Sequence, residues 1–208
     1  MARVPLSKSQ LSREKENLVA YGRYLPALDL KRQQVMGERQ RARRAIAEIE
    51  ARIAAAIAEA GEAIPMLADR RVALDGLARL GAVRMGSQNV AGVRLPVVEH
   101  VEVIRASYGR MVRPHWVDAV VERLAAAIRL RVEARVAAER LELLEAAAVR
   151  ITQRVNLFDK VLIPQARDNI RRINVYLGDA ERAAVVRSKI AKKKREAEAQ
   201  ANSRAGEA

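Results

Sequence analysis

Cysteine is absent from this 208-residue sequence, and aromatic residues make up only 3% of it. Without cysteine there are no disulfides, thiolate zinc sites, iron–sulfur clusters or cysteine nucleophiles. The shortage of aromatic side chains argues against a large spherical core, which usually relies on aromatic volume. A chain rich in Ala, Arg, Glu and Leu favours long helices or a coiled coil instead.

Long apolar runs are also missing. No stretch of about 18 apolar residues occurs, so the sequence predicts no transmembrane helix. The N-terminal residues lack the apolar segment of a signal peptide, and we therefore expect a cytoplasmic location. The two histidines, His100 and His115, are too few to indicate a metal site. We predict no metal and no cofactor.

Positive charge is in clear excess. The formal net charge is +14 and the isoelectric point is about 10.9. A basic surface suits nucleic acid, anionic lipid or an acidic protein partner, so charge alone leaves these three open. Acidic residues are interleaved with the basic ones, as in Glu139, Arg140 and Glu142, and we interpret such runs as solvated helix faces.

The strongest pattern is a helical repeat in two arms. Apolar side chains recur every three or four residues from Leu11 to Leu67 and again from Val120 to Leu162. Each repeat continues far beyond the three or four heptads that indicate a coiled coil. Ser7, three residues before Gln10, has the spacing of a capping box at the start of the first arm.

Prolines interrupt both arms. Pro26 is predicted to kink the first helix or to split it in two, and Pro65 to interrupt it again near its far end. After Pro164 the apolar repeat of the second arm shifts by one residue and then continues from Ala166 to Ala184. We interpret the shift as a kink that resets the phase of the helix.

The residues between the arms have a different composition. Glycines gather there, and residues 90–104 are β-branched and partly alternating, which predicts one or two short strands with a proline at an edge. Trp116, near the start of the second arm, is interpreted as a packing anchor.

The predicted fold class is all-α: a long antiparallel two-helix coiled-coil hairpin, with a small middle segment containing a short β-hairpin. The predicted boundaries are 1–75 for the first arm, 76–113 for the middle segment, 114–195 for the second arm and 196–208 for a frayed tail.

The sequence carries no recognisable catalytic motif. The segment 81–86 lacks the Lys-Ser/Thr end of a phosphate-binding loop, and there is no nucleophile elbow and no HExxH motif. We therefore predict no catalytic residue. Arg32 and Arg39 break the apolar repeat one heptad apart. Either their stems lie along apolar surface with the charge in water, or they contact a partner that surrounds the helices.

Four separated segments resemble the D-subunit family of V/A-type ATPases, and together they span nearly the whole chain in family order. They are residues 7–11 (SKSQL), residues 28–35 (LDLKRQQV), residues 89–96 (NVAGVRLP), and residues 154–159 (RVNLFD) with Ile163-Pro164, Glu181-Arg182 and Arg187. The last segment is the most specific. Its Leu157-Phe158-Asp159 departs from the Ala-Leu-Glu that family members often carry there.

This resemblance implies a non-catalytic central shaft that transmits torque between a hexamer of catalytic A and non-catalytic B subunits and an ion-translocating membrane ring. Partners implied besides A and B are an F-type stalk subunit and a socket subunit on the membrane ring. The resemblance suggests contacts with the hexamer at Lys31, Arg32, Arg39, Arg182 and Arg187. It suggests contacts with the F-type stalk subunit or the socket at Asn89, Val93, Arg94 and Pro96.

Two other classes of function stay open from the sequence. One is a basic coiled-coil protein that binds nucleic acid or the ribosome, which would explain the high isoelectric point. The interleaved acidic residues and the lack of aromatic stacking residues argue against it. The other is a structural or chaperone-like helical hairpin.

Overall fold

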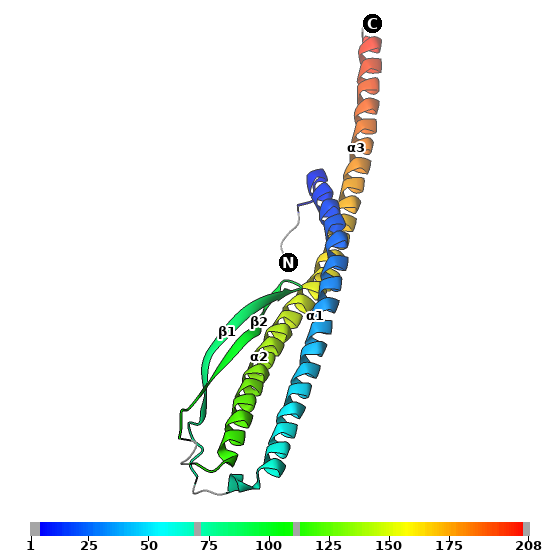
Figure 1. The fold of residues 1–208 in the computed structure, drawn as a ribbon. Coiled ribbons are helices and arrows are strands. Elements are labelled where there is room, and N and C mark those ends of the chain that lie inside the picture. The colour runs from blue at the N-terminus through cyan, green and yellow to red at the C-terminus, as the bar shows by residue number, and fades with distance from the viewer. Residues whose placement is uncertain (1–4, 69–71, 110–112, 206–208) are drawn as a thin grey trace. The chain divides into compact units, whose positions relative to one another are not determined.

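The computed structural model describes residues 5–68, 72–109 and 113–205. The elements in chain order are α1 (Lys8–Ala63), the 3₁₀ turn η1 (Pro65–Ala68), β1 (Ala78–Val90), β2 (Val93–Arg105), α2 (Trp116–Leu157), the π-helical turn η2 (Phe158–Leu162) and α3 (Ile163–Ala205) (Figure 1). The prediction of a mainly helical chain with long N-terminal and C-terminal helices is confirmed. Coiled-coil packing of these helices stays a prediction.

Helix α1 begins as its sequence predicts. The backbone N–H of Gln10 donates to Ser7 Oγ at 3.3 Å, and the N–H of Leu11 donates to the Ser7 carbonyl at 3.0 Å. Pro26 lies inside the helix without dividing it, so of the two predicted outcomes, a kink or a split, the split does not occur. A proline removes one backbone donor, which is a small loss in a helix of 56 residues. The helix ends at Ala63, just before Pro65 starts the 3₁₀ turn.

The predicted one-residue phase shift near Pro164 has a specific structural form. Residues 158–162 make a π-helical turn, in which the N–H of Ile163 donates to the carbonyl of Phe158, five residues earlier. A π turn contains one residue more than an α turn, so every later side chain is displaced by one position. The turn lies immediately before Pro164, whose missing N–H cannot continue the α-helical ladder. Beyond it, α3 continues past Arg195 as far as Ala205, where the sequence predicted a frayed tail.

The middle of the chain forms a longer β-hairpin than predicted. Strands β1 and β2 have 13 residues each and pair antiparallel from Val90↔Val93 to Ala78↔Arg105. The prediction of one or two short strands within 90–104 located β2 but missed β1. Two glycines, Gly81 and Gly86, and the polar run at 87–89 conceal the alternating pattern that identifies a strand.

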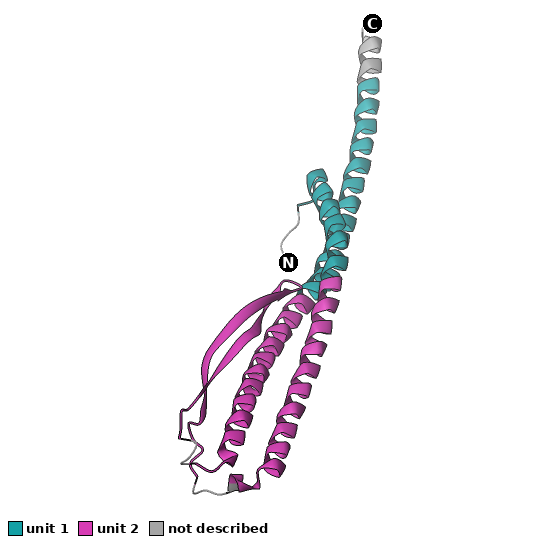
Figure 2. Cartoon of the chain, viewed as in Figure 1, with its two compact units in different colours: residues 1–28, 154–208 teal, residues 29–153 magenta. Residues whose placement is uncertain are grey.

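By compactness the chain divides into two units, of which the first is built from two segments far apart in the sequence and the second from one continuous segment (Figure 2). Unit 1 comprises residues 1–28 and 154–208, and unit 2 comprises residues 29–153. The boundaries predicted from the sequence follow the order of the elements along the chain. Each compact unit instead combines part of α1 with part of the second arm.

In unit 2, α1 and α2 run antiparallel and are joined by ion pairs. As residue numbers rise along α1 they fall along α2. The pairs are Arg43–Glu145 at 2.6 Å, Arg52–Glu133 at 3.4 Å and Glu59–Arg123 at 3.1 Å. Such partly exposed pairs each contribute at most about 1 kcal/mol, so they fix register more than they stabilise the unit.

The hairpin covers the helices of unit 2 at two points. Near its turn, Leu95 of β2 is buried in a cluster whose other buried members are Val35, Leu144 and Ala148. Near its base, Leu77 is buried against Val117 and Val121 of α2, with Trp116 packed against them. The interpretation of Trp116 as a packing anchor is confirmed.

In unit 1, α1 and α3 also run antiparallel. Asn169 Nδ2 and Gln10 Nε2 both donate to Glu14 Oε1, at 3.3 and 3.1 Å, and these bonds satisfy a buried carboxylate. The rings of Tyr21 and Phe158 meet edge to face with centroids 5.5 Å apart. Phe158 is also the first residue of the π turn, so this contact ties the turn to α1.

Candidate functional site

The described residues contain no group of three or more His, Asp or Glu side chains placed to hold a metal ion. None of the helices among them combines the length and apolar character needed to cross a bilayer. The residues that the sequence predicts as partner contacts lie on α1, the β-hairpin and α3.

Four predicted contact residues lie at or near the turn of the β-hairpin. Asn89 and Arg94 form a cross-strand pair and are exposed. Val93 is half-buried and packs against the cluster around Leu95. Pro96 is half-buried too, and its carbonyl accepts a hydrogen bond from Arg140 Nη1 at 3.2 Å. Of the four, the structure thus leaves Asn89 and Arg94 open to solvent, while Val93 and Pro96 hold the hairpin on its helices.

Lys31 lies beside the same turn. The two turn residues have positive φ angles, 51° at Ala91 and 80° at Gly92, the conformation of a tight two-residue hairpin turn. A Cβ atom added to Gly92 would be 2.9 Å from Lys31 Nζ. The structure therefore brings Lys31 to the predicted Asn89–Pro96 group, although the sequence assigned it to a different contact.

Arg140 is a residue whose role the sequence did not reveal. It was interpreted as part of a solvated face, but it is half-buried and donates to the Pro96 carbonyl and, at 3.4 Å, to Gln88 Oε1. Its guanidinium connects α2 to both strands. Only the long-range contact identifies this role, because its sequence neighbours are ordinary helix-surface charges.

The other two predicted contacts on α1 have different surroundings. Arg32 is half-buried and pairs with Asp29 Oδ1 of its own helix at 2.6 Å. Arg39 is half-buried, and its Nε atom is buried with no hydrogen-bond partner among the described residues. A buried donor usually binds water or another acceptor, so Arg39 retains capacity for a partner.

Arg182 and Arg187 lie on a part of α3 that the other described residues leave uncovered. Every residue from 181 to 197 is exposed. Arg182 pairs weakly with Asp179 at 3.3 Å on the same helix. Val186 and Ile190, 55% and 62% exposed, lie on one helix face with Ala183. We name residues 181–197 the bare helix.

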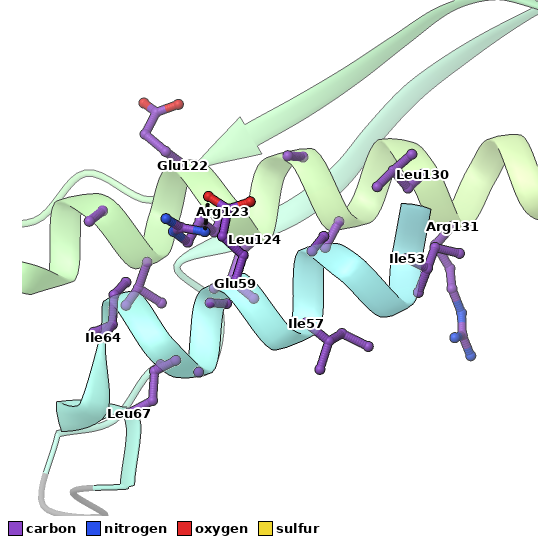
Figure 3. A pocket seen from close by; sticks show the side chains of 17 residues that line it. Ile53, Ile57, Glu59, Ile64, Leu67, Glu122, Arg123, Leu124, Leu130 and Arg131 are labelled. Atoms are coloured by element: carbon purple, nitrogen blue, oxygen red, sulfur yellow. Dashed lines mark ion pairs between the residues drawn. The ribbon is translucent and has the colours of Figure 1, made fainter. Parts of the chain in front are cut away.

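An apolar groove lies in unit 2 between the last turns of α1 with η1 and the first turns of α2 (Figure 3). Its volume is about 900 Å³. Aliphatic side chains from both sides form it: Ile53, Ile57, Ile64 and Leu67 on one side, Leu124 and Leu130 on the other. We name it the distal groove. No sequence signal distinguishes it, because its residues match the ordinary apolar repeat of both helices.

Known proteins resemble this chain over nearly its whole length. The family model that describes the D subunit of ATP synthase matches residues 10–193. The V-type ATP synthase D subunit of Borreliella burgdorferi is 34% identical over 199 residues, which cover 92% of this chain and 95% of that relative. The V-type ATP synthase D subunit of Chlamydia muridarum is 32% identical, covering 93% of this chain and 96% of the relative. The corresponding protein of Chlamydia pneumoniae is 32% identical, covering 92% of each.

Proposed function

Because the chain belongs to the D-subunit family of ATP synthases, we propose that it is the central-stalk rotor subunit of a V/A-type rotary ATPase. In this role it transmits torque between the catalytic A/B hexamer and the ion-translocating ring of the membrane. It has no active site, and ATP is hydrolysed or made in the hexamer. The protein is cytoplasmic and reaches the membrane only through its partners.

The bare helix is the structural observation that carries this proposal. Residues 181–197 form a regular helix with every side chain exposed, including Val185, Val186 and Ile190. A helix with an uncovered aliphatic stripe gains most of its stability from tertiary packing, so its packing partner is expected in another chain. Insertion of this helix into a ring of subunits supplies such a partner.

A shaft acts by making different contacts with each of its neighbours. It can bias which catalytic interface is open or closed only by its differential affinity for those states. Exposed charges give contacts of modest strength, which a turning shaft can leave again. Helix α1 alone, at 56 residues, extends about 84 Å, so the chain has the length to act at a distance.

We propose the same contact residues that the resemblance implied. Arg182 and Arg187 on the bare helix, with Arg32 and Arg39 on α1, contact the catalytic A and non-catalytic B subunits. Asn89, Val93, Arg94 and Pro96 belong to the surface for the F-type stalk subunit or the membrane-ring socket. Lys31, proposed for the hexamer, lies beside this hairpin turn.

The test is purification of the tagged chain from native membranes, with mass spectrometry and an ATPase assay on the eluate. We expect A, B and F-type subunits together with ATP hydrolysis. Charge reversal at Arg187 is expected to lower that activity more than charge reversal at Arg172, an exposed residue outside the proposed contacts. Recovery of ribosomal proteins or RNA without ATPase subunits would overturn the proposal.

The nucleic-acid alternative predicts a different result in the same preparation. A chain with net charge +14 that functions by binding RNA would bind it tightly and lose affinity steeply with salt. The family match lends no support to this alternative.

A further inference from the structure

The β-hairpin is a two-stranded sheet, so each strand has one edge that does not pair with the other strand. Strand β2 is held against α2 near both of its ends (Figure 1). The Pro96 carbonyl accepts a hydrogen bond from Arg140 at 3.2 Å, and Arg105 pairs with Glu122 at 2.7 Å. Pro96 also has no N–H to donate. The outer edge of β2 is therefore closed at Pro96 by α2.

The outer edge of β1 is open between the hairpin turn and the nearest bulge. Pro96 pairs with Ser87, and the Pro96 carbonyl points away from β1. The pair is therefore of the non-hydrogen-bonded kind, so the N–H and C=O of Ser87 point away from β2, and by the alternation of an antiparallel ladder those of Met85 and Asn89 do too. All three residues are exposed, and no group in the described part of the chain bonds to their backbone. We name residues 85–89 the open edge.

The open edge lacks the features that usually prevent the addition of a strand. Natural sheet edges are protected by bulges, prolines or charged side chains. Both irregularities of the β1–β2 ladder lie on the base side of Met85, and residues 85–89 contain no proline and no charge. Five residues extend about 17 Å, which is the length of a typical short strand. The open edge can therefore pair with an extended segment.

Charge identifies the class of occupant. Strand β1 contains no acidic residue. Near the turn, Lys31 and Arg94 are exposed and make no ion pair with another described residue. Arg94 is the cross-strand partner of Asn89, so both side chains project from the same face of the hairpin. The carboxylate of Glu99 lies over Gly86, which is three residues from Asn89 and therefore on the other face. The turn end of the open edge thus carries positive charge that a carboxylate would neutralise.

The same charge disfavours a second copy of this chain as the occupant. Antiparallel pairing of two open edges would bring Arg84, at the base end of one copy, toward Arg94 at the turn end of the other, and like charges on neighbouring strands are destabilising. A net charge of +14 per chain also opposes self-association in general. The occupant is therefore expected in a different protein.

We propose that the open edge of β1 binds an extended segment of a different protein as a third strand, with an Asp or Glu side chain at the end that meets Lys31 and Arg94. Main-chain hydrogen bonds to Met85, Ser87 and Asn89 supply the affinity, and the carboxylate fixes the register. This inference goes beyond the proposed shaft function, because it assigns a mode of binding and the chemistry of the partner. It also stands independently of torque transmission.

Hydrogen exchange resolved to single residues tests the pairing on the tagged full chain, both free and in the complex that it forms in native membranes. In the free chain we expect slow exchange at the amides of Gly86 and Gln88, which bond to β2, and fast exchange at those of Met85, Ser87 and Asn89. In the complex we expect exchange at the last three amides to slow about tenfold or more, because a hydrogen-bonded amide exchanges only when its bond opens. Unchanged rates at these three amides would overturn the proposal.

A carbodiimide, which joins an amine to a carboxylate in direct contact with it, identifies the partner segment in the same complex. We expect mass spectrometry to find Lys31 coupled to an Asp or Glu of another protein. Lys31→Arg keeps the charge but cannot be coupled, and is the control expected to lose that product. Coupling of Lys31 only to a second copy of this chain, or to no protein, would contradict the proposal. An ATPase assay on the complex reports separately on the proposed function.

A proline substitution separates backbone pairing from side-chain contact. Ser87→Pro removes an N–H that points away from β2, so it takes no hydrogen bond from the hairpin itself. Ser87→Ala is the matched control, because it removes the hydroxyl but keeps the N–H. We expect Ser87→Pro to lower the yield of the Lys31-coupled product about tenfold and Ser87→Ala to leave it unchanged, with urea unfolding of the free variants to check that both are folded. Equal yields from the two folded variants would show that the partner does not pair with the edge of β1.

Discussion

The two ends of the second arm show how the same sequence pattern leads to different surroundings. Helix α2 in unit 2 is covered by the hairpin and joined to α1 by ion pairs, and Leu144 and Ala148 are at most 2% exposed. The bare helix of unit 1 has Val186 and Ile190 at comparable helical spacing, yet both are more than half exposed. Apolar periodicity therefore predicts that a helix face needs a partner, but not whether that partner is in the same chain.

The comparison separates positions that stabilise the fold from positions available for assembly. Substitutions in the covered part are expected to reduce the free energy of unfolding, because burial is lost and a cavity remains. Substitutions in the bare helix are expected to leave that free energy nearly unchanged and to affect only the complex. Four experiments follow from this separation, each with a matched control.

The largest effect is expected from deletion of Lys160, which shortens the π turn by one residue. All later side chains of α3 then rotate by about 100°, and Ala166 and Ile173, at most 2% exposed, leave the face that meets α1. We expect a loss of about 3 kcal/mol or more in unfolding free energy, measured by urea unfolding.

Hydrogen exchange locates that loss. It is expected to accelerate in residues 8–28 and 163–180, while the β-hairpin stays protected. Deletion of Ser188 is the control, because the described side chains that it rotates, at 189–197, are already exposed. If the two deletions lower the unfolding free energy equally, the π turn does not set the phase of a packed helix face.

The second effect concerns the core of unit 2. Leu95→Ala empties a position that is 1% exposed beneath the hairpin, and we expect a loss of about 3 kcal/mol. Val185→Ala in the bare helix removes an aliphatic group that is 55% exposed, and we expect about 0.5 kcal/mol or less. Urea unfolding of the two variants under identical conditions checks the difference, and similar losses would contradict the division between covered and bare helix.

Much of the fold could be predicted because it depends on local pattern. The long helices follow from the apolar repeat, the start of α1 from Ser7 and Gln10, and the phase shift from the displaced repeat around Pro164. Each of these features is determined by residues within a few turns of one another. Strand β1 escaped prediction because its glycines and polar residues have no alternating pattern, and its pairing with β2 is what makes it a strand.

The surfaces were harder to predict, because they depend on contacts between distant residues. Arg140 looks like any helix-surface charge until its hydrogen bond to Pro96, 44 residues away, is seen. The closeness of Lys31 and Gly92 likewise depends on contact between distant parts of the sequence. The distal groove could not be predicted at all, because Ile53 follows the same repeat as residues that are covered elsewhere.

The third prediction contrasts two glycines. Gly92→Ala places a Cβ in a left-handed turn and 2.9 Å from Lys31 Nζ, so we expect a loss of about 1 kcal/mol. Gly178→Ala fills a helical position with nothing within 4 Å, and we expect a gain of about 1 kcal/mol from better helix propensity. Thermal unfolding is expected to show a lower Tm for Gly92→Ala and a higher Tm for Gly178→Ala. Shifts of the same sign would contradict the different roles assigned to the two glycines.

The smallest effect on stability is expected in the bare helix, where the effect on assembly is expected to be large. Val186→Asp with Ile190→Asp makes the exposed aliphatic stripe acidic, whereas Ala184→Asp with Ala191→Asp makes the same chemical change away from that stripe. In helix propensity Asp ranks with Val and Ile but below Ala, so the first pair is expected to change the unfolding free energy by about 0.5 kcal/mol or less and the control pair to cost somewhat more. Recovery of ATPase subunits with the tagged chain is expected to fall only for the first pair, because a stripe that packs against a ring of partners cannot accept two buried carboxylates. Equal recovery with both pairs would mean that the exposed aliphatic residues of α3 are not its contact surface, and the exposed arginines would then have to carry the interaction alone.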